Sequence, residues 1–471
     1  MLIRCNRFTH SMGLGLLLTP LFSLADEVPG LFYKDQEKSA LLAAIIEQDI
    51  PGLLQLDSND HIEIIDSNND TKRPPQSPEP VKVISINLRT KMEVFNLRNK
   101  KLRHGDKREN ELAHEPSLRM NVGVMENNPI YGRAEIEWQR KTKRKSAAQP
   151  ERQTKLELNQ AYVGLTEDII PYTHLRLGRW LYRDEREWLF DENLDGVVAQ
   201  SKLGDWHLEA LGGRVNYWQK DLLDSSTRSF EPVNIGSLIL RKKIASKWQV
   251  GAYTVAQYHG DNHDRQLNIG LRSHNPAKKG LQHWFELGMS EKRQSDSDKR
   301  GYAVDLGGTY RFEDRALKPR VTLGYAFGSQ DYRQTGLHSN EATLGGGSKF
   351  KIYGETLNPD LTNIHIFTAS LGMDLSQQAT LDVVYHRYHQ ARLSDFANNQ
   401  TDLSSKYDRQ NTRYLGSGVD MVLGWKPTDN TKVEAIVGMF SPSKRFTSAS
   451  SPHSPRSENA YSIGLEAELR F

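Results

Sequence analysis

The last eleven residues of the chain, 461–471, alternate apolar and polar positions without interruption. Side chains alternate across a β-strand with period 2, so this segment predicts a strand with one apolar and one polar face. Such a strand suits a wall between lipid and water, and it suits equally the last strand of a soluble β-sandwich. The apolar face would hold Tyr461, Ile463, Leu465, Ala467, Leu469 and Phe471, and the polar face Ser462, Gly464, Glu466, Glu468 and Arg470.

Similar alternation recurs through the chain and predicts eighteen strands, each near the 9–11 residues that a tilted membrane strand needs. The predicted strands are centred on 84–95, 118–125, 131–140, 154–165, 174–183, 196–203, 206–217, 234–242, 247–258, 265–273, 280–289, 301–312, 319–327, 363–374, 379–389, 415–425, 431–440 and 461–471.

The connections between these strands alternate in length. Connections such as 96–117, 184–195 and 328–362 are long, and the ones between them, such as 204–205 and 427–430, are short. An even number of antiparallel strands with short periplasmic turns and long extracellular loops is typical of an outer-membrane barrel. We therefore predict an all-β fold, an 18-stranded antiparallel transmembrane β-barrel with an N-terminal periplasmic extension. The last strand should pair with the first and close the wall.

Composition fits this division of the chain. The mean hydropathy is −0.65, and 26% of residues are charged, which leaves no apolar run long enough for a spanning helix. Residues 1–25 resemble a secretory signal peptide, with two arginines before the apolar stretch 12–25 and a small-residue cleavage site. The only cysteine, Cys5, lies within this segment. The expected domains are the signal 1–25, an arm and linker 26–80, and the barrel 81–471.

Charge differs sharply between these parts. Residues 26–80 hold 12 acidic and 4 basic side chains, a net charge of −8, and residues 1–25 carry +2. Because the whole chain has a net charge of +3, residues 81–471 carry +9. Basic proteins often bind nucleic acid, but no nucleic-acid motif is present, and we expect no such partner. For an exported chain, an anionic polymer of the cell envelope is the better candidate.

No motif indicates an enzyme. The histidines are scattered, the closest pair lies in 386–389, and no metalloprotease, serine-hydrolase or phosphate-loop signature occurs. We expect no cofactor. A barrel hydrolase with a Ser–His pair would need no short motif and stays an alternative, as does a purely structural barrel.

Two segments stand out chemically. Residues 175–196 combine several arginines with a carboxylate-rich bend, which fits either ligand contact or mutual bracing of the wall. Residues 334–367 lie in the longest connection and are predicted to fold into the lumen as a constriction. In that segment Gly345, Gly346 and Gly347 would supply flexibility, and Lys349 and Lys351 would share one face.

These segments resemble the alginate-export outer-membrane proteins, a family of porins that pass a polyuronate out of Gram-negative cells. The resemblance rests on LRLGRWLYRDEREW (175–188), QTGLHSN (334–340), YGE (353–355), LTN (361–363) and LDVVYHRYHQARL (381–393). It implies a pore lined by Arg179 and Arg183 on the fifth strand, Asp191 downstream, Asp221 in the following long loop, and Lys349.

The chain also departs from the family pattern. Asn159, Asn358, Glu434 and Ile436 stand where the family is basic. Either the polymer is less anionic than alginate, or the pore has moved its charge to other residues, among them Arg214, Arg241, Lys351, Arg387 and Arg413.

The function expected from the sequence is passive export of an anionic polysaccharide, with outer-membrane lipid, lipopolysaccharide and periplasmic export proteins as further partners. An uptake porin for anions or oligosaccharides is the alternative.

Overall fold

A computed structural model describes most of the barrel region of the chain. The described residues are 85–99, 102, 110–124, 128–145, 149–215, 221–224, 232–245, 247–260, 263–276, 280–294, 297–393, 406–407, 413–443, 446–447 and 458–471. The predicted signal peptide and acidic arm lie outside this set. Within it, no helix is both long and apolar enough to cross a membrane.

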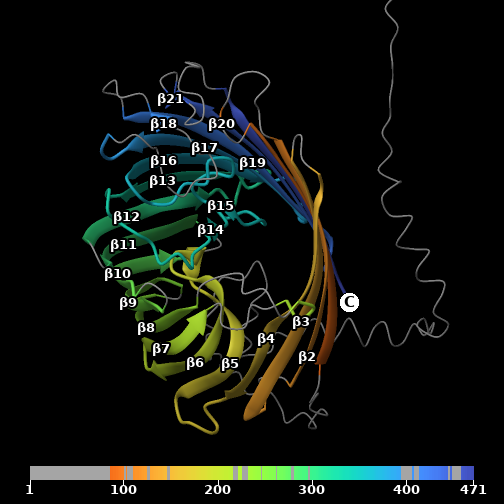
Figure 1. Ribbon diagram of the computed structural model, residues 1–471, viewed down its shortest axis with the longest axis vertical. Coiled ribbons are helices and arrows are strands. Elements are labelled where there is room, and N and C mark those ends of the chain that lie inside the picture. Colours follow the sequence, from red (N-terminus) through yellow and green to blue (C-terminus); the bar gives the residue numbers. More distant parts are fainter. Residues whose placement is uncertain are drawn as a thin grey trace, which may run out of the picture. The chain divides into compact units, whose positions relative to one another are not determined.

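Eighteen antiparallel strands form one closed sheet (Figure 1), as the alternation predicts. The strands of the wall are β1 (Ser85–Arg98), β2 (Asn110–Val124), β3 (Ile130–Lys145), β4 (Glu151–Leu165), β5 (Thr173–Arg183), β6 (Asp191–Leu203), β7 (Trp206–Val215), β8 (Val233–Lys243), β9 (Gln249–His259), β10 (Arg265–Asn275), β11 (Gly280–Gln294), β12 (Ser297–Arg311), β13 (Arg320–Gly328), β16 (Ile364–Asp374), β17 (Ala379–Gln390), β19 (Tyr414–Thr428), β20 (Thr431–Pro442) and β22 (Ala460–Arg470). Two short pairs are not part of the wall: β14 (Glu341–Ala342) with β15 (Phe350–Lys351), and β18 (Lys406–Tyr407) with β21 (Phe446–Thr447).

The C-terminal strand closes the wall as predicted. Strand β22 pairs antiparallel with β1, and the two backbone bonds between Leu88 and Phe471 measure 2.8 and 3.1 Å. Its apolar residues Tyr461, Ile463 and Leu465 are exposed outward, whereas Ser462 and Glu468 point inward and are buried. The other strands repeat this pattern, so the outer surface is an apolar belt and the interior is polar.

Several strands continue beyond their predicted ends into segments that we expected to be loops. Strand β3 extends to Lys145, and β2 begins at Asn110. The extensions are strongly charged, which hides them from a hydrophobic pattern. Cross-strand ion pairs support them, with Lys141 2.7 Å from Glu115 and Lys143 2.6 Å from Glu111.

Tryptophans divide between the two faces. Trp138, Trp248 and Trp425 are exposed outward, as the interface aromatics of outer-membrane barrels are. Trp180 and Trp284 are buried on the inner side, because they alternate along their strands with the outward-facing Leu177 and Phe285.

The β5–β6 hairpin leaves the wall and folds into the barrel. Strand β5 pairs with β4 only as far as Arg179, and β6 pairs with β7 only as far as Leu194. The bend falls at Gly178 and Gly196, which face each other across the hairpin. A Cβ on Gly178 would lie 2.3 Å from a backbone oxygen of β4, and its φ of +124° also favours glycine.

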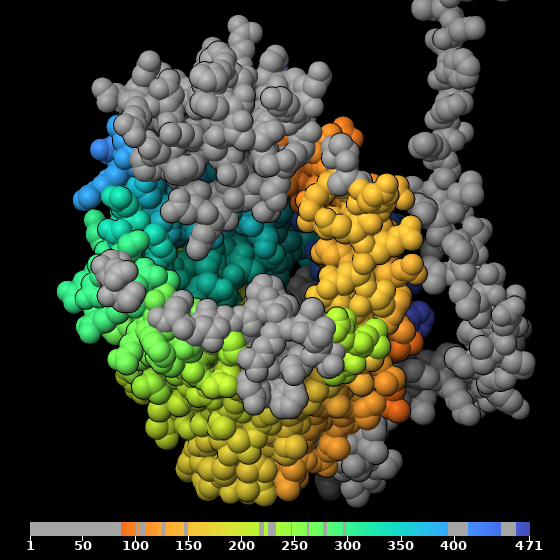
Figure 2. All heavy atoms as spheres, in the orientation of Figure 1, coloured from red at the N-terminus to blue at the C-terminus, as the bar shows by residue number. Residues whose placement is uncertain are grey.

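The long connection between β13 and β16, residues 329–363, also lies inside the ring of strands, where Figure 1 places β14 and β15. Figure 2 shows this end of the barrel hollowed, with teal residues set back within it. The backbone N–H of Gly347 donates to Thr380 Oγ1 at 2.9 Å, beside the short turn at the far end of the barrel. The connection therefore runs most of the barrel's length. Below, residues 180–193 and 329–363 are called the infolded segments.

Candidate functional site

A buried ion cluster anchors the first infolded segment to the wall. Residues Glu185–Glu187 form a 3₁₀ turn, η3, at the hairpin tip. Arg272 of β10 contacts Asp184 at 2.7 Å, Glu185 at 2.5 Å and Glu286 at 3.0 Å, and Arg241 of β8 contacts Glu185 at 3.0 Å. Burial alone would raise the pKa of Glu185, but the two arginines outweigh it and lower that pKa well below its ordinary value.

A second cluster joins both infolded segments to β11 and β12. Asp305 accepts hydrogen bonds from Trp284 Nε1 at 2.8 Å, from Arg186 at 3.1 Å and from the Tyr353 hydroxyl at 3.0 Å. The Arg186 guanidinium also lies 4.1 Å from the ring centre of Trp284. A buried charge that loses its partner destabilises the fold strongly. These ion pairs therefore fix the infolded segments in one position against the wall.

The infolded segments turn an apolar face to the wall. Trp188 and Phe190 are fully buried, and Trp188 Nε1 donates to the Tyr253 hydroxyl at 3.2 Å. The two segments also bind each other, because the Asp191 N–H donates to Leu337 O at 2.6 Å and the Asn340 N–H donates to Glu187 O at 3.1 Å.

The glycine triplet 345–347, which we expected to make the loop flexible, allows the loop to pack closely against the barrel wall. Gly346 packs over the buried Arg320–Asp382 ion pair, whose atoms are 3.2 Å apart. A Cβ on Gly346 would lie 2.1 Å from an Asp382 oxygen. The tip of the connection therefore needs glycine in order to reach the wall.

The opposite face of the infolded segments is charged and half-exposed. Lys349 lies 2.9 Å from Glu187, and Arg183 lies 3.6 Å from Glu187 and also binds Asp191. Burial and the neighbouring Asp191 raise the pKa of Glu187, against the effect of Lys349. The structure thus brings together Arg183, Asp191 and Lys349, three residues that the family resemblance implies.

Lys351 belongs to the same surface. It pairs with Glu341 at 2.6 Å across the β14–β15 hairpin, whereas Phe350 between the two lysines is buried. Burial would lower the pKa of Lys351, but Glu341 raises it above the ordinary value. Lys349 and Lys351 therefore share one face, as predicted.

The inner wall of β20, β22 and β1–β4 carries both signs of charge, arranged in pairs. Representative distances are 3.0 Å for Lys91–Glu466, 2.9 Å for Arg119–Glu137, 2.7 Å for Arg133–Glu135 and 2.8 Å for Lys432–Glu434. Glu466 is part of this pattern. Each of these basic side chains is matched by a neighbouring carboxylate, so this part of the wall has no local excess of positive charge. A basic lumen stays a prediction.

Asn159 explains one departure from the family pattern. Its side-chain N–H donates to Glu137 at 2.7 Å, at a position where β4 bulges against β3. An arginine there would compete with Arg119 for Glu137.

Arg179 lies at the bend of the hairpin. It is buried and pairs with Asp195 at 2.8 Å, which fits the bracing interpretation of segment 175–196. Side chains of β5 continue to alternate through the bend, so Arg179 is on the same face of the strand as the lipid-facing Leu177. Arg179 lies inside the barrel because the hairpin turns inward between the two residues.

Two of the predicted pore residues lie on the outer face of the barrel. Arg387 is on the outer face of β17, 4.9 Å from the ring centre of Tyr414, because strand alternation points its neighbour His386 inward. Arg214 shares the outward face of Leu208 and donates to a neighbouring asparagine. These two positions do not line the lumen.

The side chain of Asp221 binds backbone groups of β4 and of its own loop. Its side chain accepts the Leu156 N–H and the Leu223 N–H, both at 3.0 Å, and the Leu222 N–H donates to Leu156 O at 2.8 Å. This short segment pairs with the edge of β4 that the infolded hairpin leaves open. The resemblance had implied a pore role for Asp221.

Sequence reasoning missed the buried anchors. The strands β10, β11 and β12 alternate polar and apolar positions, and the polar positions include Arg272, Glu286 and Asp305. The alternation predicts that these side chains point inward, but it does not predict which residues they bind. The available signal was Trp188-Leu189-Phe190, an apolar run inside a charged loop. No group of three or more potential metal ligands occurs among the described residues.

A closed 18-stranded barrel with an apolar outer belt, a polar interior and infolded connections defines the porin class of outer-membrane proteins. The chain belongs to the alginate-export family, which it matches over residues 82–457. It is therefore an outer-membrane protein of a polysaccharide-export family, whose known role is transport.

Solved structures support the same fold. OccK5 (OpdH) of Pseudomonas aeruginosa is 12% identical, with a TM-score of 0.51 over 83% of this chain and 99% of that one. OpdQ (11% identity, TM-score 0.52, 82% and 98% coverage) and OccK7 or OpdD (10%, 0.52, 82% and 99%) of the same organism are similar. No curated protein gave a match.

Proposed function

We propose that this porin exports an anionic exopolysaccharide, alginate or a related uronate polymer, by passive and charge-selective conduction. The observation that carries the proposal is the charged face of the infolded segments, where Arg183, Lys349 and Lys351 remain partly exposed inside the barrel. Export by the family supports the direction of transport.

The pairing of these cations suits a moving polymer. Fixed cations raise the local concentration of an anionic chain and lower its entry barrier. Conduction also requires that each site release the chain. Because Glu187, Asp191 and Glu341 compete for the same cations, each polymer carboxylate exchanges with a protein carboxylate and binds weakly. Nothing in this arrangement supplies energy, so polymer synthesis would drive movement.

Block of single-channel current tests the proposal. Oligouronates added to one side of a planar bilayer should interrupt the current in a concentration-dependent and salt-sensitive manner. Neutral dextran oligomers of matched length are the control. Equal block by both polymers would refute charge selectivity, and no block by either would refute passage of a polymer.

An uptake porin for small anions or oligosaccharides is the second candidate. It is favoured by the extent of the infolded segments, which reach from Glu185 at β8 and β10 to Thr356, 2.8 Å from Ser462 on β22, and so narrow the lumen. Deletion of the protein in a polymer-producing cell distinguishes the candidates. Polymer retained in the periplasm indicates export, whereas normal secretion with slower uptake of small anions indicates the alternative.

We propose further that the acidic arm 26–80 either docks a periplasmic protein of the export complex or screens the basic charges when polymer is absent. The high density of acidic residues in the arm supports both versions. A chain lacking the arm should show altered open probability in the second version, and an unchanged open probability would eliminate it.

A further inference from the structure

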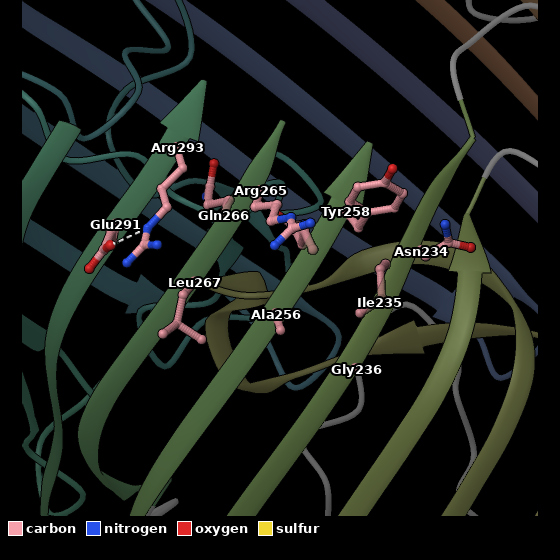
Figure 3. A pocket seen from close by; sticks show the side chains of 11 residues that line it. Asn234, Ile235, Gly236, Ala256, Tyr258, Arg265, Gln266, Leu267, Glu291 and Arg293 are labelled. Carbon is pink, nitrogen blue, oxygen red and sulfur yellow. Dashed lines mark hydrogen bonds and ion pairs between the residues drawn. The ribbon is translucent and has the colours of Figure 1, made fainter. Parts of the chain in front are cut away.

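A row of outward-facing polar side chains crosses β8–β12 at the end of the barrel that carries the long connections 216–232 and 329–363. In register, Asn234 pairs with Tyr258, Tyr258 with Arg265, Arg265 with Arg293, and Arg293 with Asp298. Figure 3 shows the first four of these side chains side by side on one face of the sheet. Two arginines therefore stand directly opposite each other on neighbouring strands.

Like charges directly opposite each other destabilise a sheet. Two carboxylates compensate them in part: Glu291 binds Arg293 at 2.6 Å and also Arg300 at 3.2 Å, and Asp298 lies opposite Arg293. Three arginines therefore share two carboxylates. The Arg265 guanidinium lies 5.8 Å from the ring centre of Tyr258. Arg293 and Arg300 are 63% and 73% exposed in their side chains. An external anion between Arg265 and Arg293 would relieve their repulsion.

The position of this row relative to the membrane identifies the kind of anion. Four residues further into the apolar belt, on the same outward face, lie Leu238, Ile269 and Met289, which are 52%, 51% and 65% exposed. Leu267, 38% exposed, lies on the same face only two residues from Arg265, so the arginines stand at the edge of the apolar belt. The edge of the apolar belt is the level at which lipid headgroups and phosphates lie.

A groove connects the arginines with the apolar belt. It has a volume of about 530 Å³, and its lining includes Gly236, Ala256 and Leu267 together with Arg265 and Arg293. A Cβ placed on Gly236 would meet no atom within 4 Å, so the space beside it is open. Glu291, which pairs with Arg293, also lines this end. The groove thus has two arginines and one carboxylate at one end, and apolar and small side chains at the other.

We propose that this groove binds a phosphorylated glycolipid of the outer leaflet. One phosphate lies between Arg265 and Arg293, where guanidinium groups can bind phosphate oxygens bidentately. An acyl chain lies along Gly236, Ala256 and Leu267. The site is on the outside of the barrel and is separate from the charged surface that we propose for the polymer.

Native mass spectrometry of the full chain tests the site, with diphosphoryl hexa-acyl lipid A as the probe. Replacement of both Arg265 and Arg293 by Gln should weaken retention of one lipid at least tenfold. The matched control replaces Arg140 and Arg144 of β3 by Gln, because these outward arginines face the uncharged residues Thr154 and Leu112. The control should bind as the native chain does.

Two further arms locate the ligand. The dephosphorylated lipid should bind the native chain as weakly as the phosphorylated lipid binds the double variant, and inorganic phosphate should not displace the lipid. Gly236→Trp should weaken both lipids by filling the groove. Resistance of folded barrel bands to SDS at room temperature confirms that each variant is folded. Equal retention by the native chain and the double variant, or by the two lipids, would overturn the proposal.

Discussion

Neutralising Lys349 should shift the ion selectivity of the pore toward cations. In the Lys349→Gln variant, the side chain stays long and polar but Glu187 loses its partner at 2.9 Å. Arg183, at 3.6 Å from the same carboxylate, remains to compensate the charge. The infolded segments should therefore keep their position while the surface becomes more negative by one charge.

Coulomb's law gives the size of the effect. One charge acting on an ion about 5 Å away in water contributes about 0.8 kcal/mol, which salt at about 0.1 M reduces to about 0.5 kcal/mol. That energy lowers the local concentration of anions about 2.3-fold and raises that of cations by the same factor. The anion-to-cation permeability ratio should fall about fivefold.

The reversal potential in a planar bilayer under a KCl gradient measures this ratio. Arg387→Gln is the matched control, since it removes one cation from the outer face of β17 and should leave the ratio unchanged. Glu187→Gln should move the ratio in the opposite direction. If Lys349→Gln and Arg387→Gln behaved alike, Lys349 would not lie on the conducting path.

Three further predictions concern how the infolded segments are held. Gly346→Ala should displace the loop tip from Asp382 and raise single-channel current noise, whereas Gly212→Ala, whose Cβ would meet nothing within 4 Å, should not; equal noise would contradict the close-approach argument. Trp188→Ala should cost about 3–5 kcal/mol of local stability, seen as faster hydrogen exchange of the hairpin tip, and unchanged exchange would refute that anchor. Burial and a nearby carboxylate raise the pKa of Glu355 to about 8. The folded state thus holds this proton at neutral pH, and attachment of the loop should weaken as pH rises from about 4.5 to about 8 and change little at higher pH; Glu355→Gln should abolish this pH dependence of hydrogen exchange in the loop, and persistence would assign it to another group.

The wall of the barrel could be predicted from the sequence because its physics is local. A strand between lipid and water must alternate, and residues 461–471 show this without any knowledge of their partners. The alternation of loop lengths then gives the antiparallel order. The charged ends of β2 and β3 escaped prediction, since Lys141 and Lys143 become strand residues only by pairing with Glu115 and Glu111.

The interior could be predicted only in part. The resemblance to a family implied Arg183, Asp191 and Lys349, and these three lie together. Strand parity should have excluded Arg387, which alternates with the inward His386. The contact between Arg272 and Asp184 could not have been foreseen, because it depends on a hairpin that separates from its neighbours β4 and β7 and crosses to β10. Neither alternation nor composition encodes that path.

The departure of the β5–β6 hairpin from the wall also affects the mechanics of the barrel. A complete ladder of backbone bonds acts as a hoop of fixed circumference, because widening it breaks bonds along a whole strand. Here the backbone ladder between β4 and β5 runs only from Leu165 to Ala161 of β4. Nearer the start of β4, its open edge binds residues 221–224 through the bond between Leu156 and Leu222. Among residues 221–224, the described part of this connection, Asp221 and Leu222 bind Leu156 of β4 in place of a full strand pair. We therefore expect the ring to widen at this seam at a lower cost than where the ladder is complete.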